Sequence, residues 1–268
     1  MPDMEGGGRV MPKGGSQKRS SSRDAVPTSK RADSLCWLQA CSASELRNNR
    51  QYRERPDQDQ KMHEDYTQVV FHLYDLHCLD PGQWLNSEVI NSYLAIVQRQ
   101  VRKGGVHILV SHFMAKLQDQ TDLELKSWVR GVCNMNKVKS IYQLDRLCMP
   151  MNISNHHWVA ILCDFRACSI TLVDSVTGHD HVPALRRLKA FLESAICAGT
   201  DKWVWHVSAL SDETYRQRNG FDCGVFTLAH VTLFALKQES RVGVCTQEIV
   251  NDMRQRVYHD LIANEIKF

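Results

Sequence analysis

The amino-acid sequence predicts an α+β fold in which helices flank a central sheet. Apolar residues recur at spacings of three and four in residues 87–101, ahead of the middle of the chain. Residues 146–174 instead hold short apolar runs rich in β-forming side chains. Helical spacing returns after residue 183, and there is no internal repeat. We expect one compact domain behind a leader of different composition.

Residues 1–64 are expected to form a disordered, weakly basic leader and linker, and residues 65–268 the folded domain. From Met1 to Leu35 there is no aromatic residue, and seven Lys/Arg outnumber four Asp/Glu. The region Ser44–Asp65 is highly charged and nearly free of aliphatic residues. Such segments bury too little apolar surface to offset the entropy lost on ordering. A nuclear-import or docking role for the paired basic residues is the alternative to a simple solvated leader.

The charge balance and hydropathy of the chain argue against two classes of protein. Beyond Leu35 the numbers of Lys/Arg and Asp/Glu are equal, whereas nucleic-acid binding requires a clustered basic excess. The longest apolar-rich run, Phe226–Leu236, is interrupted by His230 and is far shorter than the roughly 20 residues of a membrane span. We therefore expect no nucleic-acid partner and no membrane span.

The ten cysteines are irregularly spaced and include no Cys-x-x-Cys pair. Free thiols suit a reducing compartment, so the nucleus or the cytoplasm is the expected location. We expect neither a disulfide framework nor a zinc site. His179 and His181 resemble metal ligands, but no cysteine or third histidine lies at metal spacing nearby, and a polar turn is the favoured interpretation.

Two helices are predicted ahead of the sheet. The first begins near Ser87, with Asn86 or Ser87 as its N-cap. Its apolar face comprises Val89, Ile90, Tyr93, Leu94, Val97 and Val101. The second covers residues 107–118, with Leu109, Phe113 and Leu117 on one side.

Three strands are predicted next, at residues 146–153, 158–165 and 169–174, and a polar turn at Asp164–Arg166 separates the second from the third. Later elements follow from helical spacing, from β-forming residues and from turn or stop signals. They are a helix from Pro183 with Gly199 as its stop, a strand at residues 203–210, a turn at Asn219-Gly220, and helices at residues 223–237 and 246–261.

Cys223 is the candidate nucleophile. It follows a loop that ends at Asp222 and precedes Gly224, where a helical apolar pattern begins. A helix N-terminus and a nearby imidazolium lower the pKa of a cysteine and so favour its reactive thiolate. A cysteine at such a position is more often a small buried apolar residue, so this interpretation depends on its partners.

His157 and Asp174 are the candidate partners. His157 stands where one predicted strand begins, and Asp174 stands 17 residues later, where the next one ends. Antiparallel pairing would bring the two side chains together at one end of the sheet. The carboxylate could then hold the imidazole in the tautomer whose other nitrogen faces the thiol. The adjacent His156 leaves a choice of register, which the Trp directly after His157 decides.

The chain also carries an ordered set of motifs. They are Trp84-Leu85-Asn86-Ser87-Glu88-Val89-Ile90-Asn91, His157-Trp158, Asp164-Phe165-Arg166, Asp174-Ser175 and Gln217-x-Asn219-Gly220-x-Asp222-Cys223-Gly224-x-Phe226. In these motifs the sequence resembles the ubiquitin-like-protein-specific cysteine proteases, the sentrin or SUMO protease family. The resemblance spans roughly Tyr66–Phe268. It implies a papain-like fold, with a central, mostly antiparallel sheet flanked by helices and the nucleophile at a helix N-terminus. Residues 65–268 would be its catalytic domain.

The resemblance also implies a role for each matching position. Cys223 would be the nucleophile, His157 the general base, Asp174 the orienting carboxylate and Gln217 a donor of the oxyanion hole. Trp84 and Trp158 would wall a narrow channel for the substrate, although core packing is the alternative for each. Asn219 and Gly220, in the loop before the nucleophile, would contact the substrate. Ser87 departs from the aspartate common at its position, which puts in doubt only a charged contact there.

The implied function is hydrolysis of the bond after the C-terminal Gly-Gly of a ubiquitin-like modifier, for precursor maturation or for removal from target lysines. SUMO is the favoured modifier and partner, and the protein is expected to act as a monomer without a metal or organic cofactor. The alternatives are a protease for a Nedd-type modifier or ubiquitin, an acyltransferase of the same clan, and a catalytically silent modifier-binding module. Asp174 disfavours the acyltransferase, because the resembling enzymes typically carry Glu there.

Overall fold

The computed structural model describes residues 61–64, 70–101, 105–194, 203–210, 216–238 and 245–266. These residues all belong to one unit of the chain, Leu35–Phe268. Except for Lys61–Glu64, the predicted leader and linker lie outside the described residues. Strand β1 (Lys61–Glu64) lies just ahead of the expected domain boundary. It pairs antiparallel with β2 (Val70–His72), which lies just after that boundary. That boundary stays a prediction.

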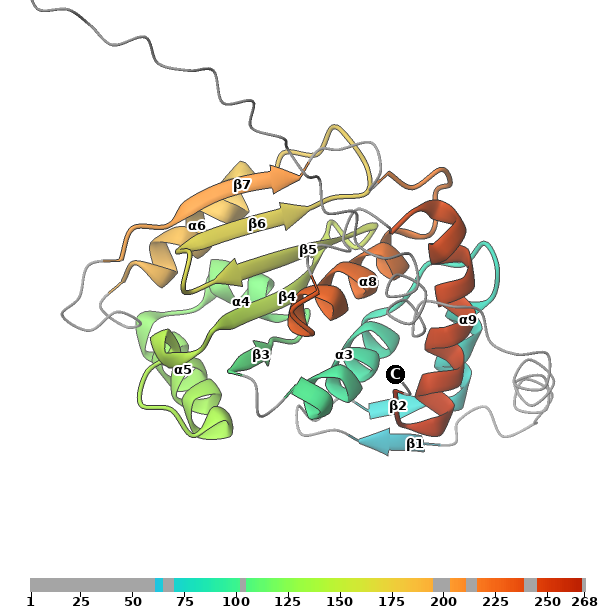
Figure 1. Cartoon of the computed structure of the whole chain (residues 1–268), viewed down its shortest axis with the longest axis horizontal. Coiled ribbons are helices and arrows are strands. Elements are labelled where there is room, and N and C mark those ends of the chain that lie inside the picture. Colours follow the sequence, from blue (N-terminus) through green and yellow to red (C-terminus); the bar gives the residue numbers. More distant parts are fainter. Residues whose placement is uncertain are drawn as a thin grey trace, which may run out of the picture. The chain divides into compact units, whose positions relative to one another are not determined.

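A five-stranded sheet forms the centre of the fold, with its strands in chain order (Figure 1). They are β3 (Val106–Ile108), β4 (Arg146–Ile153), β5 (His157–Asp164), β6 (Ser169–Val173) and β7 (His206–Leu210). Strands β4, β5 and β6 pair antiparallel, whereas β3 and β7 join the two edges in parallel. The predicted α+β class and the three middle strands are confirmed. Two of the four strand pairings are antiparallel and two are parallel, so the sheet is mixed and not mostly antiparallel.

The turn between β5 and β6 is built by one side chain. Asp164 Oδ1 accepts hydrogen bonds from the backbone N–H groups of Arg166 and Ala167, both at 2.9 Å. This Asx-turn reverses the chain where the sequence predicts it. The ladder ends with Ala160 opposite Val173, so the start of β5 and the residue after β6 reach the same end of the sheet.

Six α-helices and two 3₁₀ helices accompany the strands in the described residues. They are η2 (Leu73–Leu79), α3 (Ser87–Val101), α4 (Phe113–Asp119), α5 (Asp122–Asn136), η3 (Ile141–Gln143), α6 (Val182–Leu192), α8 (Cys223–Ala235) and α9 (Gln247–Ala263). The predicted cap of α3 is confirmed, since Asn86 Oδ1 accepts a hydrogen bond from the N–H of Val89 at 2.9 Å.

Other boundaries differ from the predictions. The helix predicted at residues 107–118 is wrong at its start, because His107 lies in β3 and α4 begins only at Phe113. Helix α6 ends at Leu192, and the predicted stop at Gly199 lies outside the described residues. Strand β7 begins at His206 instead of residue 203.

Helix α5 is absent from the predictions, although its N-terminus carries a capping box. Glu124 Oε2 accepts hydrogen bonds from the N–H and the hydroxyl of Thr121, at 2.8 and 2.9 Å. The pattern Thr-x-x-Glu is a sequence signal for a helix start, so this element could have been found.

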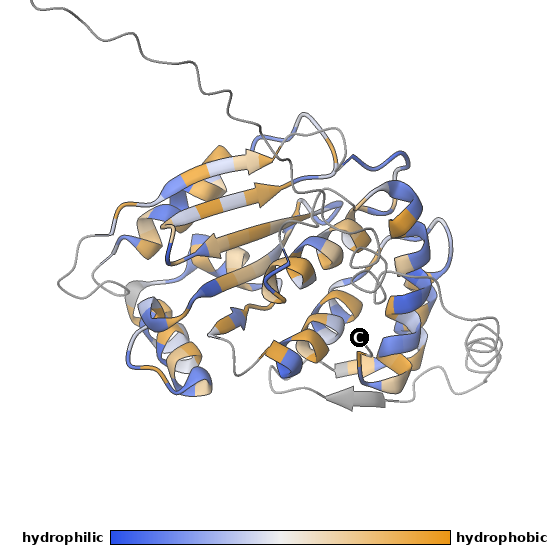
Figure 2. Ribbon diagram, in the orientation of Figure 1, coloured by the Kyte–Doolittle hydropathy of each residue, from blue (hydrophilic) through white to orange (hydrophobic). Residues whose placement is uncertain are grey.

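The core has two parts, one on each face of the sheet. Strand β5 alternates between them: Trp158, Ala160 and Leu162 pack with α3, α8 and α9, while Val159, Ile161 and Cys163 pack with α4, α5 and α6. Every residue of α8 is buried, and apolar residues predominate along it in Figure 2. A helix enclosed on all sides has no polar face, which explains its uniform sequence. None of the helices among the described residues combines the length and the apolar character needed to cross a membrane.

Candidate active site

Cys223 is the first residue of α8, and its side chain is enclosed, with 2% of the residue exposed. Asp222 precedes it as the N-cap residue, and the Asp222 carbonyl accepts the hydrogen bond of the Phe226 N–H at 3.0 Å. The thiol therefore lies at the positive end of the helix dipole, which favours negative charge on sulfur.

The loop ahead of Cys223 is held through the carboxylate of Asp222, which is itself buried. Its Oδ1 accepts two hydrogen bonds from Arg254, at 3.0 Å from Nε and 2.7 Å from Nη2. Its Oδ2 accepts from Asn219 Nδ2 at 2.6 Å and from Gln247 Nε2 at 2.8 Å. Arg254 also donates to the backbone carbonyls of Cys78, Asp80 and Phe221. A buried charge satisfied on every side fixes the loop in one arrangement.

His157 and Asp174 meet at the end of the sheet, as the predicted pairing requires. His157 Nε2 donates to Asp174 Oδ1 at 2.6 Å, and both side chains are buried. The imidazole also interacts with the side chain of Cys223, and this interaction raises the pKa of His157. Since Nε2 is committed to Asp174, Nδ1 is the nitrogen that faces the thiol.

The electrostatics of this pair favour the charged forms. Burial lowers the pKa of His157, but the hydrogen bonds and charges of Asp174 and Cys223 outweigh it and raise the pKa to about 9. Burial also raises the pKa of Asp174, and bonding to His157 and to the Val176 N–H outweighs it, so that the pKa lies below its ordinary value. An imidazolium beside the sulfur stabilises a thiolate, the reactive form of cysteine.

His156 takes no part in this arrangement. Its side chain is exposed, bonds to the carbonyl of Ser154 and meets the Trp84 ring edge to face, with ring centroids 5.8 Å apart. Of the two adjacent histidines, His157 is thus the one whose side chain reaches Asp174.

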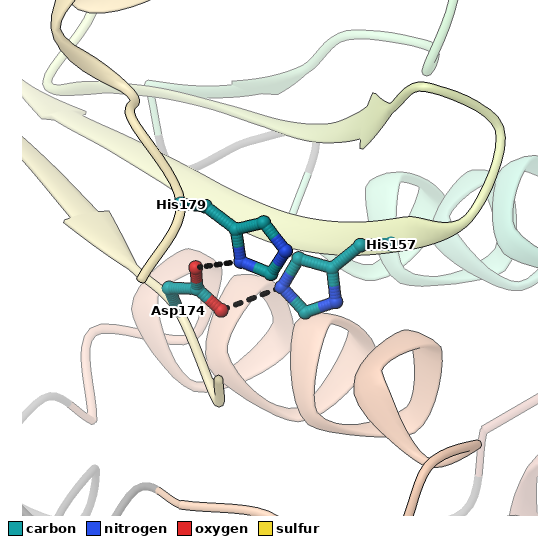
Figure 3. A group of neighbouring side chains, drawn as sticks. All are labelled: His157, Asp174 and His179. Carbon is teal, nitrogen blue, oxygen red and sulfur yellow. Dashed lines mark hydrogen bonds and ion pairs between the residues drawn. The ribbon is translucent and has the colours of Figure 1, made fainter. Parts of the chain in front are cut away.

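Two further histidines, His179 and His181, also reach Asp174. The sequence predicts only that they lie in a polar turn. Asp174 Oδ2 accepts from His181 Nε2 at 2.7 Å and from His179 Nδ1 at 3.3 Å. The His179 and His157 rings lie next to each other (Figure 3). They are stacked, with centroids 4.4 Å apart and planes 16° apart. Their spacing from Asp174, five and seven residues, is the only signal of this cluster in the sequence.

The potential ligand atoms of His157, Asp174 and His179 lie within 4.8 Å of one another. A metal ion binds imidazole in the plane of the ring, along the lone pair of a nitrogen. Because these two rings are stacked and nearly parallel, their in-plane lone pairs do not converge on a single point. The geometry fits a hydrogen-bonded cluster around one carboxylate and does not fit a metal centre.

The side chain of Gln217 joins the segment after Asp174 to the loop that precedes Cys223. Its Oε1 accepts from the Ser175 hydroxyl at 2.8 Å, and its Nε2 donates to the carbonyl of Asn219 at 2.6 Å. One amide hydrogen is thereby used, and the second is available to a substrate oxygen. The role in an oxyanion hole stays a prediction.

Asn219 and Gly220 make hydrogen bonds that hold the loop ahead of Cys223 in place. Asn219 Oδ1 accepts from the N–H groups of Phe221 and Asp222, at 3.2 and 3.1 Å. The carbonyl of Gly220 accepts from Trp84 Nε1 at 2.7 Å. These bonds give Asn219 and Gly220 a structural role, and their contact with substrate stays a prediction.

The two tryptophans differ in burial. Trp84 is 49% exposed, so core packing does not account for it, whereas Trp158 is 4% exposed and belongs to the core. Trp158 Nε1 donates to the carbonyl of Leu85 at 2.8 Å, which ties β5 to the residue after Trp84. Both rings line one pocket, together with Asn86, His112 and His156.

The chain is similar to known proteins over much of its length. Residues 83–266 match the family described as the Ulp1 protease family, C-terminal catalytic domain. The ubiquitin-like-specific protease ESD4 of Arabidopsis thaliana is 25% identical over 197 residues, which cover 70% of this chain and 39% of the relative. Sentrin-specific protease 2 of Rattus norvegicus is 29% identical over 162 residues, covering 57% and 26%. The chain thus spans well under half the length of these relatives.

Solved structures share the fold. The C-terminal Ulp1 protease domain in complex with Smt3, the yeast ortholog of SUMO, superimposes with a TM-score of 0.71 at 17% identity, covering 86% of this chain and 99% of that domain. The Ulp1-like SUMO protease catalytic domain of Chaetomium thermophilum gives 0.66 at 20% identity, covering 85% and 92%. At identities this low, the superpositions establish the common architecture alone. That architecture confirms the predicted fold class.

Proposed function

The chain belongs to the Ulp1 protease family, and on that premise we propose that it is a thiol protease and isopeptidase for a ubiquitin-like modifier. It hydrolyses the bond after the modifier's C-terminal Gly-Gly, either in a precursor or at a target lysine. The observation that carries this proposal is the order Cys223, His157, Asp174, in which His157 interacts with Cys223 and is hydrogen-bonded to Asp174 at 2.6 Å. A nucleophile, a base and an orienting carboxylate in this order are the requirements of acyl transfer.

The first half of the reaction forms a thioester. The Cys223 thiolate attacks the carbonyl carbon of the terminal glycine, and the carbonyl oxygen becomes negatively charged. The second amide hydrogen of Gln217 and the N–H groups at the start of α8 stabilise that oxygen. His157 gives the proton on Nδ1 to the leaving amine, the C–N bond breaks, and the modifier stays bound to sulfur.

The second half releases the modifier. Neutral His157 accepts a proton from water, and the resulting hydroxide attacks the thioester carbonyl. The C–S bond breaks, sulfur leaves as thiolate, and the modifier departs with a free carboxylate. Throughout the reaction Asp174 keeps the second proton of the ring on Nε2, so Nδ1 remains the working nitrogen.

SUMO is the favoured modifier. The relatives include a sentrin-specific protease, and one of the structures with the same fold is a complex with the yeast ortholog of SUMO. We further propose that the protein acts as a monomer in the nucleus or the cytoplasm, without a metal or organic cofactor. The cysteines among the described residues are free thiols, which suits a reducing compartment.

The test uses SUMO, a Nedd-type modifier and ubiquitin, each with an electrophile in place of its C-terminal carboxylate. We expect the full chain to form a covalent adduct with the SUMO probe and Cys223→Ala to form none. An adduct with another modifier alone would reassign the specificity. A chain that binds a modifier without forming any adduct would instead be a silent binding module.

A further inference from the structure

The carboxylate of Asp174 is bound on both of its oxygens. Oδ1 accepts from His157 Nε2 at 2.6 Å and from the Val176 N–H at 2.8 Å. Oδ2 accepts from His181 Nε2 at 2.7 Å, a much shorter contact than the 3.3 Å to His179. The His181 side chain is 12% exposed, compared with 34% for His179. His181 is thus the principal partner of the oxygen that does not face the catalytic imidazole.

We propose that His181 is a positioning residue for the proposed protease reaction, on which this inference rests. Its Nε2–H holds Oδ2 of Asp174 and thereby keeps Oδ1 directed at His157. His181 acts through Asp174, because its bonded partner is the carboxylate and not the sulfur or the imidazole of His157.

The reason lies in the freedom of an aspartate side chain. The torsion that turns a carboxylate is broad and roughly two-fold, so a single anchored oxygen leaves the plane free to swing. His157 and the Val176 N–H both bond to Oδ1, so together they anchor only one of the two oxygens. The bond from His181 anchors Oδ2 and thereby fixes the plane of the carboxylate. An ionised donor or acceptor makes such a hydrogen bond about twice as strong as a neutral one.

The same contact determines which ring nitrogen of His181 is the donor. A carboxylate only accepts, so Nε2 carries a proton. Nδ1 is enclosed and has no hydrogen-bond partner among the described residues. Burying a polar atom without a partner is unfavourable, so a purely structural role would be filled better by an apolar side chain. The bond from His181 Nε2 to Asp174 Oδ2 therefore explains why a histidine occupies this position.

The first experiment compares two amide side chains that differ by one methylene. The amide nitrogen of Gln in His181→Gln takes about the place of Nε2, whereas that of Asn in His181→Asn falls short of Oδ2. We expect the Asn variant to lower kcat about 10-fold, the order of magnitude for one lost charge-assisted hydrogen bond, with KM unchanged. The Gln variant should recover most of kcat.

Asp180→Asn is the matched control for the turn. Asp180 is exposed and its Oδ1 accepts from the Val182 N–H at 3.0 Å, a bond that asparagine can also make. We expect native kcat from it. Equal kcat for His181→Asn and His181→Gln would overturn the proposal, as would a change confined to KM.

The second experiment separates positioning from a general effect on the fold. His181→Asn is combined with Asp174→Ala, and the rate of adduct formation with the reactive modifier probe is measured. If His181 acts through Asp174, the substitution has no further effect once the carboxylate is gone. An equal loss in both backgrounds would contradict the inference. Failure of the native chain to react with any modifier probe would instead sink the proposed function.

Discussion

A Cβ atom placed on Gly224 would lie 2.9 Å from the Cβ of Leu85. Gly224 directly follows the nucleophile, and Leu85 lies between Trp84 and the cap of α3. The absence of a side chain at position 224 thus lets the first turn of α8 approach the segment that carries Trp84. Local sequence patterns do not reveal this packing, because it joins residues far apart in the chain.

We predict that Gly224→Ala is overpacked. Added atoms in a packed core typically cost about 1–3 kcal/mol, and a displacement of about 1 Å at the reacting atoms can cost ~10²-fold in rate. The unfolding free energy in urea and kcat/KM on a fluorogenic modifier would both fall. Gly131→Ala is the control, since nothing lies within 4 Å of a Cβ at position 131. A Gly224→Ala variant as stable and as active as the native chain would contradict the packing argument.

Asp174→Asn is expected to lower kcat by about 10⁴-fold, the loss found when a triad carboxylate becomes an amide. An asparagine can present its N–H to Nε2 and so hold the wrong tautomer of His157. Pre-steady-state formation of the thioester measures this step directly. Native kinetics in this variant would move the orienting role to another residue.

The pKa of His157 predicts an alkaline limit to activity. The ring must carry a proton to give to the leaving amine, and that proton is present below a pKa of about 9 and lost above it. Amide hydrolysis should therefore decline as the pH rises through about 9. Asp174→Asn removes a group that raises this pKa, so the decline should begin at lower pH.

Alkylation of Cys223 by iodoacetamide provides the contrast, since it needs the thiolate and no proton donor. Its rate should not fall above the pH at which hydrolysis declines. If both rates decline together, the titrating group is not acting as the general acid.

Gln217→Ala should lower single-turnover cleavage by about 10²-fold to 10³-fold, the usual cost of one oxyanion donor. Ser175→Ala is the milder companion. It removes the hydroxyl that donates to Gln217 Oε1 and leaves the amide donor in place. Equal rates for Gln217→Ala and the native protein would exclude this side chain from the oxyanion hole.

The tryptophans predict selectivity for glycine. Trp84 and Trp158 line one pocket, and a Cβ on the modifier's penultimate residue is expected to clash with their rings. The native chain should cleave a Gly-Gly modifier much faster than its Gly-Ala counterpart. Trp158→Ala should impair positioning by about 10²-fold, and the half-exposed Trp84 should matter less. Equal cleavage of the two substrates by the native chain would rule out such a channel.

The local sequence was sufficient where composition, run length and turn signals agree. The three middle strands are short runs of β-forming residues, and α8 is a longer apolar run after the turn Asn219-Gly220. Antiparallel pairing of β5 and β6 then places His157 beside Asp174. The edge strands of the sheet were harder to predict. Strand β3 has only three residues, one of them the buried His107, and a pattern of period two cannot be read from so few positions.

The part of the candidate site that escaped prediction consists of contacts made by a turn. His179 and His181 reach Asp174 only because the chain folds back after β6, and no local pattern encodes that path. Likewise, the partnership of Arg254 with Asp222 joins residues 32 positions apart, on α9 and ahead of α8. Side-chain chemistry identifies such residues as polar, but only the three-dimensional structure assigns their partners.

The contacts of Arg254 have a consequence for the order in which the molecule is made. This one guanidinium on α9 binds carbonyls at Cys78 and Asp80 and the carboxylate next to Cys223. A ribosome delivers Cys223 before α9, so the growing chain carries the sulfur while the support of its loop is still missing. The loop that carries the thiol therefore gains its full set of hydrogen bonds only when α9 docks.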